Sequence, residues 1–263
     1  MVMIRSGGLG LHVRADGPEQ APALLLLNSL GTDLHMWDGL VASLAGEFRI
    51  IRFDKPGHGR SETAPRPYDM AGLAAHALAA LDRFGVASAH VLGLSIGGQI
   101  AMALAAAQPG RVNRLVLSNT AARIGSGAIW ADRIGALERG GIDAIADAVM
   151  ARWFSRRWRL ANPRALAGWR NMLCQSDLTG YLGCCDALAT ADLSETCRQL
   201  CQRTLVIAGG EDGATPPEAV RATASLISGA EFVVIDGVGH LPCIEDPARY
   251  LVLLRDFLAT DRA

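Results

Sequence analysis

A serine stands between two glycines in the segment 93–97 (GLSIG). An apolar, strand-like run (89–94) leads into it, and an alanine-rich helical pattern (96–107) follows it. A G-x-S-x-G sequence between a strand and a helix predicts a nucleophile elbow, a tight turn that lifts the serine hydroxyl above the sheet. The amino terminus of the following helix favours negative charge that develops nearby. Ser95 is therefore the predicted nucleophile, and the alternative is an ordinary glycine-rich turn.

A serine hydroxyl needs a base to remove its proton, and His240 is the predicted base. It lies in the segment 237–242 (GVGHLP), just after the last strand-like run (231–235), in a loop that opens at the same edge of the sheet as Ser95. The other five histidines fit less well because of their places in strands, in a helix, or before the serine in the chain: His12, His35, His58, His76 and His90. The order Ser…Asp…His is typical of this motif set.

The base in turn needs a carboxylate that fixes its tautomer and supports the imidazolium ion. Asp212 follows the strand-like run 204–208, at the same predicted edge, and is the preferred candidate. Glu211 is its main competitor, and Asp236 is less favoured because it lies only four residues before the histidine. An Asp-Gly pair of this kind would also suit a simple turn.

Ester hydrolysis further needs two donors directed at the carbonyl oxygen of the substrate. One predicted donor is the backbone N–H of Ile96, the residue after the nucleophile. The other should come from the loop 28–33 (NSLGTD), which follows the strand-like run 23–28, and Leu30 is the candidate there.

Strand-like and helical segments alternate along the rest of the chain, and the longest of them give the predicted order of elements. The strand-like runs are 11–14, 23–28, 49–53, 89–94, 114–118, 204–208 and 231–235; the helical patterns are 70–84, 96–107, 217–227 and 247–258. This alternation predicts an α/β fold with a mostly parallel sheet and helices on both faces. No strand-like run interrupts the region from 120 to 202, which reads as a helical insertion. The predicted domains are a core (1–119 and 203–263) and a helical lid (120–202).

The composition narrows the range of partners. Among 263 residues, 50% are hydrophobic and 19% are charged, and the net charge is −1. A near-neutral chain has no basic field, which argues against nucleic acid as a partner. No apolar run approaches the roughly 20 residues of a membrane span, so we expect no membrane partner. The first residues lack the pattern of a secretory signal, and the expected location is the cytoplasm.

Five of the six cysteines fall between Cys174 and Cys201, which raises the question of a metal cluster. Their spacing includes no CxxC pair, and no histidine lies among them. The sequence therefore predicts reduced, mostly buried thiols and no metal site.

Several segments together resemble the α/β-hydrolase family, over essentially the whole chain, and within it the 3-oxoadipate enol-lactonases of aromatic catabolism. The segments are 28–37 (NSLGTDLHMW), 57–61 (GHGRS), 93–98 (GLSIGG), 119–125 (NTAARIG) and 180–185 (GYLGCC). The second and third are shared by much of the superfamily. The other three are more discriminating, above all the one in the lid, because lids decide the substrate in this fold.

Two departures from the family pattern concern loops around the site. The family usually has Asp-x-Arg-Gly-His-Gly, whereas the segment 54–59 reads DKPGHG and places Pro56 where the arginine would be. The segment 238–240 (VGH) fits the family's histidine loop loosely. Both bear on substrate preference and neither touches the predicted triad.

The resemblance implies hydrolysis of 3-oxoadipate enol-lactone, a small ring ester with a free carboxylate, without a metal or organic cofactor. A buried carboxylate needs a cation or several donors. The lid offers five arginines: Arg123, Arg133, Arg152, Arg156 and Arg157. Arg133 lies three residues after Trp130, so the two share a helical face. We expect Trp130, Arg133 and Trp153 to line the substrate pocket; the alternative is a role in lid packing or at the surface. The oligomeric state stays open.

Other activities fit the same core residues. Esterases, C–C bond hydrolases and cofactor-free perhydrolases share this arrangement, and some members of the fold are ligand receptors with a vestigial triad. Dehalogenases and epoxide hydrolases are disfavoured because their nucleophile is an aspartate and position 95 is a serine. A fold alone does not determine the substrate.

Overall fold

A single eight-stranded sheet forms the centre of the computed structural model, which describes residues 2–259. The strands are β1 (Val2–Ser6), β2 (Leu9–Asp16), β3 (Ala23–Leu27), β4 (Arg49–Phe53), β5 (Ala89–Leu94), β6 (Val112–Ser118), β7 (Arg203–Gly209) and β8 (Glu231–Ile235). Their order is β1-β2-β4-β3-β5-β6-β7-β8. The six strands β3 to β8 are parallel to one another. The β1–β2 hairpin joins them through β2, which pairs with β4 in antiparallel register. The predicted α/β class is confirmed.

The central strands are apolar because helices cover both of their faces. Leu24, Leu25 and Leu26 of β3 are inaccessible to solvent, as are Leu115 and Val116 of β6. Continuous apolar runs of this kind are expected for parallel strands buried on both sides, where alternation would expose one face.

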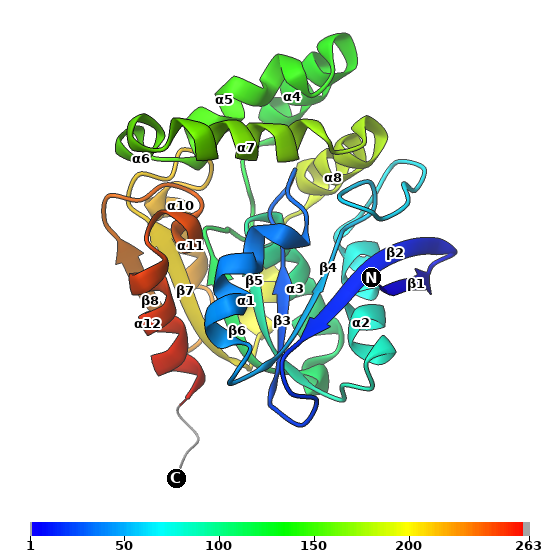
Figure 1. Ribbon diagram of the computed structural model, residues 1–263, viewed down its shortest axis with the longest axis vertical. Helices are drawn as coiled ribbons and strands as arrows, with labels where there is room; N and C mark the ends of the chain where they lie inside the picture. The colour runs from blue at the N-terminus through cyan, green and yellow to red at the C-terminus, as the bar shows by residue number, and fades with distance from the viewer. Residues whose placement is uncertain (1, 260–263) are drawn as a thin grey trace.

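Two layers of helices enclose the sheet. On one face, α1 (Asp38–Leu44) and α12 (Pro247–Leu258) contact each other and lie in front of the sheet in Figure 1. On the other face, α2 (Met70–Arg83) packs against α3 (Ile96–Ala107). The shorter elements are η1 (Leu34–Trp37), η2 (Pro109–Arg111), α10 (Pro217–Ala224) and α11 (Pro242–Glu245).

Six helices lie between β6 and β7; the first five form a cap over the carboxyl ends of the parallel strands (Figure 1), and the sixth packs against α3 of the core. They are α4 (Gly127–Gly140), α5 (Asp143–Trp153), α6 (Arg156–Ala161), α7 (Pro163–Cys174), α8 (Leu178–Thr190) and α9 (Ser194–Gln199). The cap is anchored to the core through α8. Asp177 N–H donates to Gly57 O at 2.9 Å, and a Cβ on Gly180 would collide with the backbone of Gly57.

Several elements differ from the sequence prediction. The hairpin partner β1 and the short helices α1 and α11 were not predicted, and the strand predicted at 11–14 is the centre of the longer β2. β1 is an edge strand of five residues with a single buried side chain, Ile4, so its sequence carries little apolar pattern. The helix predicted at 217–227 ends at Ala224. Within the described residues, no helix has the length and apolar character that crossing a membrane requires.

Candidate active site

Ser95 occupies a strained turn between β5 and α3. Its backbone has φ 59° and ψ −122°, a left-handed conformation that few non-glycine residues adopt. The turn is possible because Gly93 and Gly97 lack side chains: a Cβ on Gly93 would collide with Gly97 O, and one on Gly97 with the carbonyl of Leu27. Strain of this kind persists where surrounding structure enforces it, and it concentrates at functional sites.

Residues from β6 and the loop after it hold the elbow in place. The Ser95 N–H donates to Ser118 O at 3.0 Å, and the Thr120 hydroxyl donates to Ser95 O at 2.7 Å. The serine is therefore fixed through its backbone, while its side chain faces a cavity of about 490 Å³ between the core and the cap.

The His240 ring lies at the wall of the same cavity and is paired with Asp212. Nδ1 of His240 lies 2.8 Å from Oδ2 of Asp212, and both side chains are almost fully buried. An Nδ1–H that donates to this carboxylate leaves Nε2 as the atom able to accept a proton. Glu211, the competing carboxylate, is exposed to solvent, so the structure brings Asp212 and not Glu211 to the histidine.

Four further donors converge on the Asp212 carboxylate. Oδ1 accepts from the backbone N–H groups of Ala214 (2.7 Å) and Thr215 (3.0 Å), and Oδ2 from the Thr215 hydroxyl (2.6 Å) and Asn119 Nδ2 (2.9 Å). Burial alone would raise the pKa of Asp212, but His240 and the hydrogen bonds from Thr215 and Asn119 outweigh it and hold that pKa below its ordinary value. The carboxylate is thus kept ionised beside the imidazole.

Asn119 is a residue of this site that sequence reasoning did not assign a role. It has φ 48°, and its side-chain amide also donates to Gly239 O at 3.3 Å, so it links the strand β6 to both the aspartate and the histidine loop. The only sequence signal was its place in the NTAARIG segment.

The hydroxyl of Ser95 and the ring of His240 line one cavity without a hydrogen bond between them, and the hydroxyl has no other partner in the stretch 2–259. Long or misaligned catalytic hydrogen bonds are common in enzymes without a bound substrate, and they tighten when the substrate binds. The arrangement is compatible with proton transfer from the serine to Nε2.

One predicted oxyanion donor lines this cavity, and the other follows Ser95 directly in the chain. Leu30 belongs to its lining, and Ile96 begins α3 directly behind the serine. Across residues 2–259, neither backbone N–H meets a protein acceptor. Two free N–H groups next to a nucleophilic serine can hold the charged oxygen of a tetrahedral intermediate.

The cap supplies the rest of the wall, including the three predicted residues Trp130, Arg133 and Trp153. The Arg133 guanidinium lies 5.4 Å from the ring centre of Trp130 and donates from Nη2 to the Tyr181 hydroxyl at 2.7 Å. Its Nε is buried without a hydrogen-bond partner, and no carboxylate among the described residues forms an ion pair with it.

Arg152 is a second cation of this wall, which the sequence offered only as one of five lid arginines. Burial and the nearby Arg133 charge lower the pKa of its guanidinium, and within 2–259 it has no acidic partner. Arg123 also lines the cavity but lies 3.9 Å from the Asp192 carboxylate and is exposed. Two neighbouring guanidinium groups thus face the cavity uncompensated, an arrangement suited to an anionic ligand.

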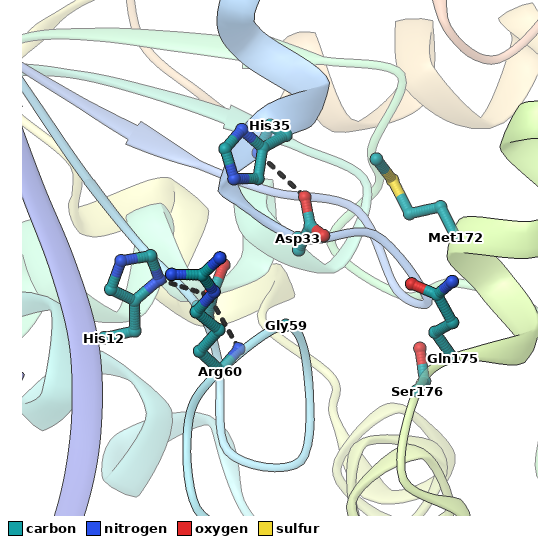
Figure 2. Close-up of a pocket in the computed structure, with 9 residues that line it drawn as sticks. His12, Asp33, His35, Gly59, Arg60, Met172, Gln175 and Ser176 are labelled. Atoms are coloured by element: carbon teal, nitrogen blue, oxygen red, sulfur yellow. Dashed lines mark hydrogen bonds and ion pairs between the residues drawn. The ribbon is translucent and has the colours of Figure 1, made fainter. Parts of the chain in front are cut away.

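A second, smaller cavity of about 250 Å³ lies outside the site (Figure 2). It is lined by His12, Asp33, His35, Asp54, Gly59, Arg60, Met172, Gln175 and Ser176. Nδ1 of His12 donates to Oδ2 of Asp54 at 2.8 Å, so these groups satisfy one another and tie β2 to the loop after β4. His12 and His35, considered above as bases, therefore lie apart from Ser95.

The cysteines form no cluster. Cys184, Cys185, Cys197 and Cys243 are buried singly or as neighbours in the cap and core, and Cys201 is exposed. In the part of the chain that the structure describes, no group of three or more histidine, cysteine, aspartate or glutamate side chains could hold a metal ion.

Comparison with known proteins places this geometry in a family. The model of the α/β hydrolase fold matches residues 22–137 and 144–247. The chain is 33% identical to 3-oxoadipate enol-lactonase 1 of Acinetobacter baylyi, over 95% of this chain and 94% of that protein.

Solved structures agree with this match. The enol-lactonase from Burkholderia xenovorans LB400 superposes with a TM-score of 0.95 at 38% identity, covering 98% of this chain and all of that one. A thermophilic esterase from Thermogutta terrifontis superposes with a TM-score of 0.91 at 28% identity, covering 98% and 97%. The chain therefore belongs to the α/β-hydrolase fold family and is a hydrolase of ester bonds, with enol-lactonases among its relatives.

Proposed function

We propose that this protein hydrolyses 3-oxoadipate enol-lactone to 3-oxoadipate, a step of the β-ketoadipate pathway of aromatic catabolism, with Ser95 as nucleophile. The observation that carries the substrate class is the pair Arg133 and Arg152, two cations without acidic partners that face the cavity of Ser95 and His240. A substrate carboxylate would supply the missing charge, since hydrogen bonds to charged groups are each worth about 1.5–3 kcal/mol.

The first half-reaction forms an acyl-enzyme. The Ser95 hydroxyl attacks the ring carbonyl, and its proton passes to Nε2 of His240, whose imidazolium form is stabilised by Asp212. The carbonyl oxygen becomes an oxyanion held by the N–H groups of Leu30 and Ile96, each worth about 3 kcal/mol of barrier.

Collapse of the intermediate breaks the ring C–O bond. The leaving oxygen departs as an enolate and takes the proton from His240 to give an enol, which tautomerises to the ketone by moving that proton to carbon. Because an enolate is a stabilised leaving group, this step needs little further acid assistance. The acyl chain stays on Ser95 at one end and keeps its carboxylate at the other. Water then gives its proton to His240 and attacks the acyl carbon, which releases 3-oxoadipate and restores the serine.

The remaining groups of the cavity fit a small, flat ring. Trp130 and Trp153 are large, buried side chains at the cavity wall, with the cationic groups beside them. The relatives named as enol-lactonases support the same substrate. We include no metal, organic cofactor, nucleic acid or membrane in this proposal; the partner is the lactone alone.

The test is an assay with freshly generated 3-oxoadipate enol-lactone beside p-nitrophenyl acetate. We expect a higher kcat/KM for the lactone, and loss of both activities in Ser95→Ala. Faster turnover of the simple ester would overturn the lactonase assignment and favour a general esterase. A burst of one equivalent without turnover would favour a ligand receptor, and full activity in Ser95→Ala would overturn the mechanism.

A further inference from the structure

Lys55 is the single lysine of the chain; the other 24 of the 25 basic residues are arginines. It is also buried, with 1% of its surface exposed, in the loop that follows β4. Buried lysines are rare unless they are paired with an acid. No acidic side chain in the described residues reaches the Lys55 ammonium, and the reaction proposed above does not use it.

Three backbone carbonyls take the place of an acid. Nζ of Lys55 donates to the carbonyl oxygens of Ser29 (2.9 Å), Asn28 (3.3 Å) and Thr32 (3.4 Å). An ammonium has three N–H donors, so all of them are used when the lysine is protonated. All three acceptors belong to the loop after β3 that carries Leu30.

The shortest of these bonds bears on the direction of the oxyanion donor, at a carbonyl that the Thr32 hydroxyl of the same loop also binds at 2.8 Å. Ser29 C=O and Leu30 N–H belong to one planar trans peptide unit, in which the two groups point in opposite directions. With the Ser29 carbonyl drawn toward Lys55, the Leu30 N–H must point the other way. Leu30 lines the cavity of Ser95, and its N–H has no protein acceptor in the range 2–259.

We propose that Lys55 is the positioning residue of the oxyanion hole: its ammonium, bound to three carbonyls of the loop 28–32, turns the Leu30 N–H toward the reacting carbonyl. This inference rests on the serine mechanism proposed above, but not on the identity of the lactone. Its charge also polarises the Ser29–Leu30 peptide and adds positive potential close to the oxyanion.

Among Lys55 and the titratable groups packed around it, the Lys55 ammonium is the group that titrates closest to neutral pH. Burial lowers the pKa of Lys55 to about 8, against the nearby negative charges of Asp54 and Asp33, and Cys184 of α8 packs close to it. The Cys184 thiol is neutral, because burial raises its pKa to about 12. The Asp54 carboxylate is engaged elsewhere, by Leu34 N–H and His12, and Asp33 faces the small cavity of Figure 2.

His58 gives the loop a second support that does not titrate in this range. Gly31 N–H donates to its Nε2 at 3.1 Å, and its Nδ1 lies 3.0 Å from Pro56 O. Burial and the charge of Lys55 lower the pKa of His58 to about 3, so it stays neutral. A change in kcat near pH 8 that comes from this loop therefore reports on Lys55.

The first test is Lys55→Met, which keeps an unbranched side chain of similar length and removes its charge and donors. We expect kcat for p-nitrophenyl acetate to fall about 10²-fold, the usual effect of losing one oxyanion donor, with KM changed far less. A matched control is Arg198→Met, which removes an exposed cation of α9 and should leave kcat unchanged. A folded Lys55→Met enzyme with wild-type kcat would overturn the proposal.

The second test needs no variant and decides the matter if Lys55→Met does not fold. Uniform ¹⁵N-lysine labelling places one side-chain signal in the NMR spectrum, and its titration should have a midpoint near 8. We expect kcat to fall above pH 8 with the same midpoint. A kcat that stays level while the signal titrates would overturn the proposal. Failure on the lactone with a normal profile on the ester would contradict the substrate assignment alone.

Discussion

The backbone N–H of His240 donates a 2.8 Å hydrogen bond to the carbonyl oxygen of Trp153, the last residue of α5 in the cap. The proposed base and a wall of the pocket are thus held in one contact. Glu245 strengthens it: Oε1 accepts from the N–H groups of Gly239 (2.8 Å) and Ser155 (3.0 Å), and Oε2 from the Ser155 hydroxyl (2.5 Å). The position of the cap therefore fixes the position of the histidine.

Replacement of Glu245 by alanine should weaken both stability and activity. Two buried N–H groups would lose their acceptor, at about 1–3 kcal/mol each. For a chain of this size we expect the melting temperature to drop by about 5 °C or more, and kcat to fall about tenfold. Calorimetry and ester kinetics measure the two effects. Glu218→Ala, which removes an exposed glutamate of α10, is the control. Equal melting temperatures and kcat values in the two variants would contradict a link between the cap and the histidine loop through Glu245.

Asp212→Asn should abolish most of the activity without unfolding the protein. An asparagine amide is uncharged and has only one oxygen acceptor in place of two. It therefore no longer fixes the Nδ1–H tautomer of His240, and kcat should fall about 10⁴-fold. Glu211→Gln changes the exposed neighbouring carboxylate and should leave kcat as it is. If Glu211→Gln is the damaging variant, the assignment of the acid is wrong.

The two cations of the pocket should contribute to binding of a charged substrate only. We expect Arg133→Gln and Arg152→Gln each to lower kcat/KM for the enol-lactone about tenfold or more, through KM, as loss of a charged hydrogen bond implies. The same variants should keep kcat/KM for p-nitrophenyl acetate within about twofold, because that ester has no carboxylate. An unchanged KM and kcat on the lactone would remove Arg133 or Arg152 from the substrate site.

Burial of Lys55 makes a distinct prediction for stability against pH. An unfolded lysine keeps its proton up to about 10.5, whereas the folded Lys55 loses it near 8. Between these values the unfolded chain binds more protons, so the stability of the wild type relative to Lys55→Met should rise with pH, by at most about 1.4 kcal/mol per pH unit.

Urea titrations of the two proteins between pH 7 and 10 measure this difference, and the buried cysteines contribute equally to both. Activity should fall over the range in which relative stability rises, and the same titrations show directly whether the wild type stays folded there. A relative stability that falls above pH 8 would contradict the lowered pKa of Lys55.

Much of the fold was predictable because its elements follow from local patterns of apolar residues and turn residues. The runs of β4, β5 and β8 and the helices α3 and α12 are predicted to the residue. Each combines continuous apolar residues or helical spacing with a clear stop, such as the Pro-Gly after α3. The hairpin strand β1 was missed because an edge strand needs only one buried side chain, Ile4.

The site divides in the same way. Ser95, Asp212 and His240 follow strands whose carboxyl ends meet at one edge, so chain order alone indicated that they approach. Asn119, Arg152 and Lys55 could not be assigned, since their roles depend on which loop or helix packs across from them. Backbone acceptors, such as the Ser29 carbonyl under Lys55, leave no trace in side-chain chemistry.

The central claim is that the pocket selects a lactone with a free carboxylate. The most direct measurement is the ratio of kcat/KM for 3-oxoadipate enol-lactone to that for its methyl ester, with the wild-type protein. The two compounds share the ring that reacts and differ in charge. We predict a ratio of about ten or more, which corresponds to about 1.4 kcal/mol. A ratio of one or less would contradict the account.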